Sequence, residues 1–173
     1  MDGNSYSRVN AVNYAITYAL SPNPSYRYFP IINNNGGDCA NFLSQCLKAG
    51  GAPMSFNASN YWWYKHSGPN TKNDTWSVSW AVAHSLYWLL KVNGAKNLVG
   101  PKGFEVNNAG SLQIGDLIFY EDANGAIFHS AIVTSMANGY PLISQHSFEA
   151  LNISYEKTWE AKKMHFFSFP SFF

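Results

Sequence analysis

Apolar residues recur at helical spacing through the first half of the chain. Residues 4–20 carry apolar or aromatic side chains every three or four positions, and the same spacing returns over residues 38–49 and 77–91. This period predicts three amphipathic helices. Glycine pairs flank the middle one, at Gly36-Gly37 and Gly50-Gly51, and mark its ends. The run of three asparagines that precedes Gly36 predicts an irregular loop leading into this helix.

The second half of the chain changes to short strand-like runs. Apolar segments separated by turn residues lie at 117–120, 127–134, 141–146, 153–155 and 164–168. Turn dipeptides such as Asn138-Gly139 connect neighbouring runs, which indicates an antiparallel meander. Helices gathered before strands are typical of an α+β fold, in which N-terminal helices pack on a C-terminal antiparallel β-sheet.

Length and charge narrow the class of protein. With 173 residues, 46% of them hydrophobic, the chain can bury one substantial core, so we expect a single domain over residues 1–173. Eleven basic and ten acidic residues leave a formal charge of +1 without a basic run, which argues against nucleic acid as a partner.

The sequence also bears on location. It has no run of about 18 apolar residues, so we expect no membrane partner. Few charges and many Asn, Ser and Tyr residues suit a secreted or cell-wall-associated monomer, although the first residues do not have the form of a signal peptide.

Cys39 is the first candidate for chemistry. It falls in the first turn of the helix predicted over residues 38–49, where unpaired N–H groups and the helix dipole favour a thiolate. A lone cysteine is otherwise usually a small buried hydrophobe. Cys46 fits that description, because it lies two helical turns further along the same face among apolar neighbours, roughly 10 Å from Cys39 and too far to form a disulfide.

His129 supplies a partner for Cys39. It opens the strand predicted over residues 127–134, where a rigid sheet can hold an imidazole against a sulfur on a helix. A third polar group would fix the tautomer of the ring, and the next strand offers Ser144, Gln145 and His146. Alternation puts Ser144 and His146 on one face and Gln145 on the other, so the register decides. We favour His146.

Three further features receive structural interpretations. The aromatic cluster of residues 61–64 is interpreted as packing over the helices, with stacking on a sugar or peptide as the alternative. His84 lies off the apolar face of its helix and is interpreted as a solvated side chain without a chemical role. Asp38 is interpreted as a helix cap and not as a catalytic acid.

Several of these segments together resemble a known family. They are residues 8–15, residues 38–45 (DCANFLSQ) with Gly50-Gly51, residues 115–120 (GDLIFY), residues 129–134 (HSAIVT) and residues 144–146 (SQH). This set is similar to the bacterial family called "Putative amidase domain", which is related to the NlpC-type and CHAP-type cysteine peptidases and amidases. The resemblance spans most of the chain and implies a papain-like fold.

The resemblance also implies roles. Cys39 would be the nucleophile and His129 the general base and then acid, with Gln145 or His146 in the third position. The upstream tyrosine of NlpC-type enzymes has Tyr26 and Tyr28 as possible matches. The implied reaction is hydrolysis of an amide bond in a peptide or cell-wall peptide through a thioester, with no cofactor.

Other functions are compatible with the same residues. One is an inactive module that binds a glycan or peptide through aromatic residues such as Tyr61, Trp62, Trp63 and Trp76, and another is a thiol-dependent acyltransferase. A zinc site formed by Cys39, His129 and His146 is a third reading, which the absence of any short-spaced ligand pair disfavours, so we expect no bound metal.

Overall fold

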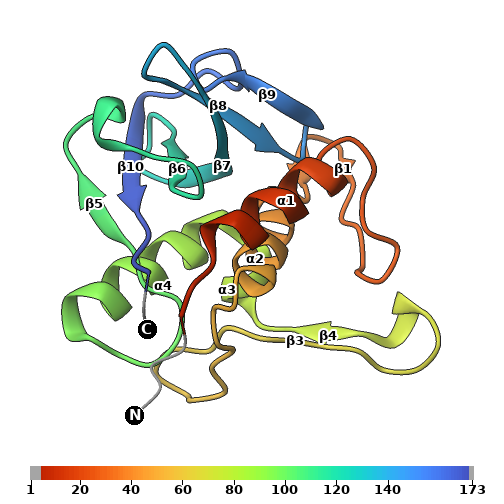
Figure 1. The fold of residues 1–173 in the computed structure, drawn as a ribbon. Helices are drawn as coiled ribbons and strands as arrows, with labels where there is room; N and C mark the ends of the chain where they lie inside the picture. Colours follow the sequence, from red (N-terminus) through yellow and green to blue (C-terminus); the bar gives the residue numbers. More distant parts are fainter. Residues whose placement is uncertain (1–4, 172–173) are drawn as a thin grey trace.

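The computed structural model describes residues 5–171 and joins four helices to an antiparallel sheet (Figure 1). The helices are α1 (Arg8–Tyr18), α2 (Cys39–Ala49), α3 (Val78–Ala81) and α4 (Ala83–Lys96). The six-stranded sheet has the order β5 (Phe104–Val106), β10 (Lys163–Ser168), β6 (Leu117–Glu121), β7 (Ile127–Ala137), β8 (Tyr140–Gln145) and β9 (Ala150–Ser154). Mixed helix and sheet, with antiparallel pairing throughout, confirms the α+β class.

Short elements project from this core. Two small hairpins pair β1 (Ile31–Ile32) with β2 (Asn35–Gly36) and β3 (Tyr64–Lys65) with β4 (Thr75–Trp76), and two 3₁₀ turns span Thr71–Asn73 and Ala109–Ser111. Neither hairpin was expected, because strands of two residues leave no periodic signal in the sequence.

Three predicted elements differ from the observed ones. The first helix begins at Arg8, because the Ser7 side chain accepts a hydrogen bond from the Asn10 N–H at 3.2 Å and caps it there. The third predicted helix is two helices, since the backbone is extended at Val82. The sheet is not a simple meander either, because β10 lies between β6 and β5. The sequence pattern did not indicate β5.

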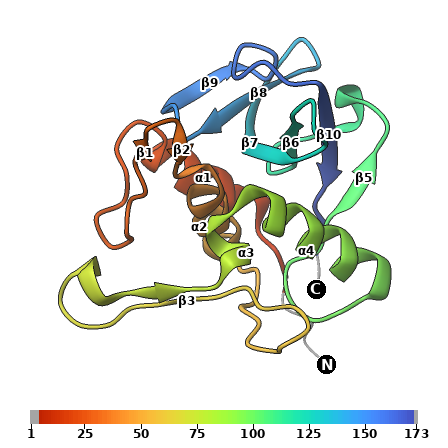
Figure 2. The ribbon, with the colours of Figure 1, turned by 180° about the vertical axis from the view of Figure 1, so that it is seen from behind.

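The helices cover one face of the sheet (Figure 2). Leu43 and Leu47 of α2 and Leu86 of α4 are fully buried in one cluster with Phe119 and Ile132 of the sheet. The opposite face of the sheet has its own smaller cluster. Strand residues whose side chains point away from the helices form it together with loop residues: Leu112, Ile118, Tyr120, Ala131, Val133, Ile143 and Tyr155. The sheet is therefore buried on both sides, and its strands hold their side chains rigidly.

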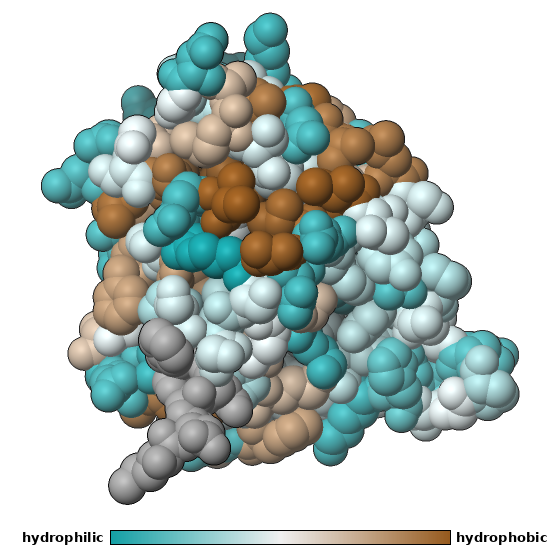
Figure 3. All heavy atoms as spheres, viewed as in Figure 1, coloured by the Kyte–Doolittle hydropathy of each residue, from teal (hydrophilic) through white to brown (hydrophobic). Residues whose placement is uncertain are grey.

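Hydrophobic and hydrophilic side chains occupy different parts of the surface. Hydrophobic side chains gather over α1 and the strands beside it, whereas the projecting β3–β4 hairpin is mostly hydrophilic (Figure 3). No helix within residues 5–171 has the length and apolar character needed to cross a bilayer.

Candidate active site

The first turn of α2 and the start of β7 meet at one pocket. Cys39 is the first residue of α2, and His129 is the third residue of β7. Both side chains line a pocket of about 370 Å³, and the Cys39 side chain reaches it while only 8% exposed. The turn before Cys39 depends on Gly37, whose φ of +116° disfavours any other residue and where a Cβ would meet Ser147 Oγ at 3.1 Å.

The two cysteines of α2 have different surroundings. Burial raises the pKa of Cys39, whereas the nearby Ser130 hydroxyl and the Ser130 and Ala40 backbone N–H groups act in the opposite direction. Cys46 is fully buried, and burial raises its pKa well above the ordinary value. A hydrogen bond with its own backbone acts in the opposite direction. Of the two thiols, Cys39 alone lines the pocket.

A defined hydrogen-bond network sets the tautomer of His129. The Gln145 Nε2 donates to the Phe148 carbonyl at 3.1 Å, which makes Gln145 Oε1 the acceptor for the Thr158 hydroxyl at 2.8 Å. The same Oε1 lies 2.7 Å from His129 Nε2, so Nε2 carries the proton and Nδ1 keeps its lone pair. Within residues 5–171 the ring makes no hydrogen bond to the Cys39 sulfur.

Burial also sets the charge of the ring. His129 is 1% exposed, and this desolvation lowers its pKa to about 4 in spite of the opposing hydrogen bond to Gln145. The imidazole is therefore neutral at neutral pH and able to accept a proton at Nδ1.

The register of β7 and β8 decides which residue stands beside His129. Ile132 pairs with Ser144, which places Gln145 on the same face as Ala131 and His129. His146 then points to the opposite face. The expected contact between His146 and His129 is therefore absent, and Gln145, another of the three candidates, takes that position.

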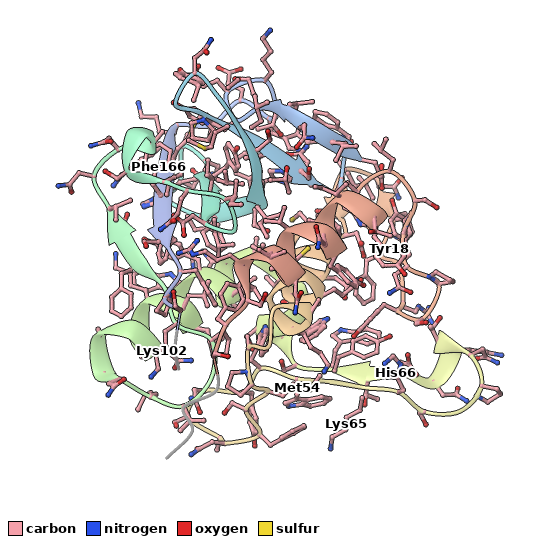
Figure 4. All side chains as sticks on the ribbon, in the orientation of Figure 1. Tyr18, Met54, Lys65, His66, Lys102 and Phe166 are labelled. Carbon is pink, nitrogen blue, oxygen red and sulfur yellow. The ribbon has the colours of Figure 1, made fainter. Side chains whose placement is uncertain are left out.

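His146 belongs to a separate buried cluster under α2. Its Nδ1 lies 2.6 Å from Asp38 Oδ2 and its Nε2 lies 2.7 Å from the carbonyl oxygen of Tyr18, which Figure 4 labels at the end of α1. The ring stacks on Phe42 with centroids 4.1 Å apart. Both nitrogens face acceptor oxygens, so this ring has no free lone pair with which to take a proton from a thiol.

Asp38 holds this cluster together. We expected its side chain to cap α2, and it does not. It occupies the N-cap position without a capping hydrogen bond to the helix backbone. Its Oδ1 instead accepts from the Phe29 N–H at 2.9 Å and from Asn41 Nδ2 at 2.8 Å, while its own N–H donates to Ser147 Oγ at 2.7 Å. Asp38 thus fixes the backbone that precedes the nucleophile candidate.

The remaining candidates lie elsewhere. Ser144 bonds Thr134 at 2.7 Å, Tyr28 donates to Glu149 at 2.6 Å, and Tyr26 packs against Tyr64. None of the three lines the Cys39 pocket. Within residues 5–171 no group of three Cys, His, Asp or Glu side chains is placed to hold a metal ion.

His84 and the aromatic cluster agree with their structural interpretations in part. His84 is exposed, as expected, but its Nδ1 also accepts the Ile127 N–H at 3.1 Å and so links α4 to the start of β7. Trp62 and Tyr64 are buried in the core, whereas Tyr61 is 47% exposed. The cluster therefore contributes both to packing and to the surface.

Sequence reasoning did not identify the residues that close the pocket. Ile31, Asn34 and Asn35 line it from the β1–β2 hairpin, and Trp159 lines it from the loop before β10. The Trp159 indole donates to the Ser147 carbonyl at 2.7 Å, which holds the ring in place. The asparagine run marked the hairpin segment only as a loop, and no local signal pointed to Trp159.

Comparison with known proteins identifies the family. The family model described as "Putative amidase domain" matches residues 5–169. The chain is 36% identical over 149 residues to the uncharacterized protein YhbB of Bacillus subtilis (strain 168), covering 84% of this chain and 42% of that protein. It is 32% identical over 159 residues to the uncharacterized protein YjcM of the same organism, covering 87% of this chain and 33% of that one.

The chain thus spans less than half the length of these curated relatives. No solved structure matches it significantly. The extent of the family match and both relatives lead to one conclusion: the chain belongs to the "Putative amidase domain" family.

Proposed function

We propose that the protein is a cysteine-dependent amidase or peptidase with a papain-like core, in which Cys39, His129 and Gln145 act together. Membership of an amidase family supports amide hydrolysis. The observation that carries the proposal is that Cys39 and His129, from elements 90 residues apart in the chain, line one pocket, with Gln145 bonded to the far nitrogen of the ring. His146 is excluded from the proposed set, because both of its nitrogens are already engaged.

The reaction follows from these positions. His129 Nδ1 takes the thiol proton of Cys39, and the sulfur attacks the amide carbonyl to form a tetrahedral intermediate. Collapse of the intermediate breaks the C–N bond, and the imidazolium gives its proton to the departing amine, which leaves a thioester on Cys39. Water then attacks the thioester, His129 accepts its proton, and the carboxylic acid leaves as the thiol is restored.

The N-terminus of α2 is placed to stabilise the negative charge that develops on the carbonyl oxygen during the reaction. The first N–H groups of a helix have no partner within the helix, and the dipole there favours negative charge. We assign the Cys39 backbone N–H, at the first position of α2, as a donor to the developing oxyanion.

The walls of the pocket suggest the kind of substrate. Apart from Cys39 and His129, they consist of aliphatic, aromatic, amide, glycine and hydroxyl groups without an acidic or basic side chain. Such walls suit an uncharged stretch of peptide around the scissile amide, and we propose a short cell-wall peptide outside the cytoplasm as the substrate class.

The experiment is digestion of purified cell-wall peptides with detection of newly released amino groups. The unaltered protein and the Cys46→Ala variant are expected to release them, whereas Cys39→Ala is expected to release none while keeping its circular dichroism spectrum. Equal release by Cys39→Ala and Cys46→Ala would contradict the proposal.

A further inference from the structure

A second hollow, separate from the Cys39 pocket, is lined by four aromatic rings, two of them exposed and two half-buried. It has a volume of about 550 Å³ and lies between the 58–63 loop, the start of α3 and α4. Tyr61, Trp63, Trp76 and Trp88 line it, and Tyr61 and Trp88 are 47% and 48% exposed. Because rings this large are normally buried, their exposure in one concave place needs an explanation beyond packing.

Neighbouring rings and ammonium groups contact two of these rings, the half-buried Trp63 and the exposed Trp88. Trp63 stacks on Phe56 at 6.0 Å, with the Lys65 ammonium 5.1 Å from both ring centroids (Figure 4 labels Lys65). Trp88 meets the Tyr87 ring edge-on at 5.2 Å, with the Lys91 ammonium 5.5 Å from its centroid. Rings fixed before a ligand arrives lose little entropy on binding.

The backbone behind the rings is fixed as well. Ser79 donates to the Tyr61 carbonyl, and Ser77 Oγ accepts the Trp63 N–H at 3.1 Å. Asn60 Nδ2 donates to the Val99 carbonyl at 2.5 Å. The Ser77, Ser79 and Asn60 side chains of this wall are thus engaged inside the protein.

This combination selects the chemistry of the ligand. None of the described residues lining the hollow is charged, and the two ammonium groups near it, those of Lys65 and Lys91, lie over the rings of Trp63 and Trp88. A peptide would leave its backbone amides unpaired against these walls, at a cost in free energy. A pyranose ring presents an apolar C–H face to an aromatic ring and keeps its hydroxyl groups in water. From this contrast we propose that the hollow binds an uncharged saccharide chain.

The hollow is linked to the Cys39 pocket through a third one. That intermediate hollow, of about 470 Å³, shares Asn35 and Gly36 with the Cys39 pocket and shares Trp76 with the aromatic hollow. The intermediate hollow therefore borders each of the other two. Resting on the function proposed above, the aromatic hollow would hold the glycan part of a substrate whose amide lies at Cys39.

Titration of the Cys39→Ala variant with hexa-N-acetylchitohexaose, an uncharged hexasaccharide, tests this inference by calorimetry and by the NMR shifts of the tryptophan indole N–H groups. Saturable binding is expected, with the indole signals of Trp63, Trp76 and Trp88 moving most. Adding Trp88→Ala or Trp63→Ala is expected to weaken binding about tenfold each. Tyr140→Ala, which removes an equally exposed ring on β8, is the matched control and is expected to change nothing.

Absence of binding at 10 mM hexasaccharide, or binding that the Trp63 and Trp88 variants leave unchanged, would overturn the inference. Equal or tighter binding of an uncharged hexapeptide would also overturn it. Because the titration needs no turnover, its failure with active hydrolysis would refute the saccharide site alone, and saccharide binding without hydrolysis would refute the proposed reaction alone.

Discussion

Gln145 and His146 are neighbours at the end of β8, yet they belong to two regions with opposite properties. On one face, Gln145 Oε1 accepts a hydrogen bond from His129 Nε2–H, and the other nitrogen of this pocket-lining ring keeps its lone pair. On the other face, His146 is bonded at both nitrogens, to Asp38 and to the Tyr18 carbonyl. The comparison shows that a buried histidine is available for chemistry only when its neighbours leave one nitrogen free.

The two regions also differ in how they support Cys39. The His129 region faces the sulfur through the pocket, whereas the His146 region fixes Asp38, the residue immediately before Cys39. We therefore expect changes in the first region to reduce the rate and changes in the second to reduce the stability of the fold.

Removing the imidazole of His129 is expected to have the largest effect. His129→Ala should lower kcat for release of amino groups from wall peptides by about 10³-fold, because general acid–base catalysis is lost. The variant should still unfold in urea at a midpoint close to that of the unaltered protein, so the loss of rate would not reflect unfolding. Retention of more than a tenth of the activity would remove His129 from the proposed mechanism.

The corresponding change in the other region is expected to act on stability. His146→Leu leaves the Asp38 carboxylate buried without its partner, so the free energy of unfolding should fall by about 3 kcal/mol. The double variant Asp38→Asn with His146→Leu should recover part of that loss. Urea unfolding of both variants checks this, and a midpoint unchanged in His146→Leu would show that the pair does not stabilise the fold.

Acid is expected to destabilise the fold through His129. Its folded pKa of about 4 lies below the ordinary value of 6.5, so the unfolded chain binds the proton first as the pH falls. Stability is therefore lost between pH 6.5 and pH 4, by about 3 kcal/mol from this group. His129→Ala should show a correspondingly shallower loss in urea unfolding over this range, and identical pH profiles would contradict the lowered pKa.

The orienting amide should have the smallest effect. Gln145→Ala removes one hydrogen bond to His129, worth about 1 kcal/mol, so kcat should fall about fivefold. Gln145→Asn keeps the amide on a shorter side chain, and its kcat should lie between that of Gln145→Ala and that of the unaltered protein. Wild-type kinetics in Gln145→Ala would indicate that packing alone orients the ring.

Local patterns in the sequence predicted the α+β class and the helix that begins near Cys39, because periodicity and glycine pairs are local signals. The choice between Gln145 and His146 depended on the strand register, which irregularities in pairing near Val133 and Ile143 helped to set. These irregularities leave no trace in a single sequence. The hairpin and Trp159 that wall the pocket were likewise out of reach, since their positions depend on long-range contacts.

The central claim, that the Cys39 thiol and the His129 ring work in one site, can be tested most directly without a substrate. Iodoacetamide labelling, followed residue by residue with mass spectrometry, should modify Cys39 in the folded protein while Cys46 stays protected. His129→Ala should slow the reaction at Cys39, and Tyr140→Ala should not. Equal rates at the two cysteines, or a rate at Cys39 that does not depend on His129, would contradict the account.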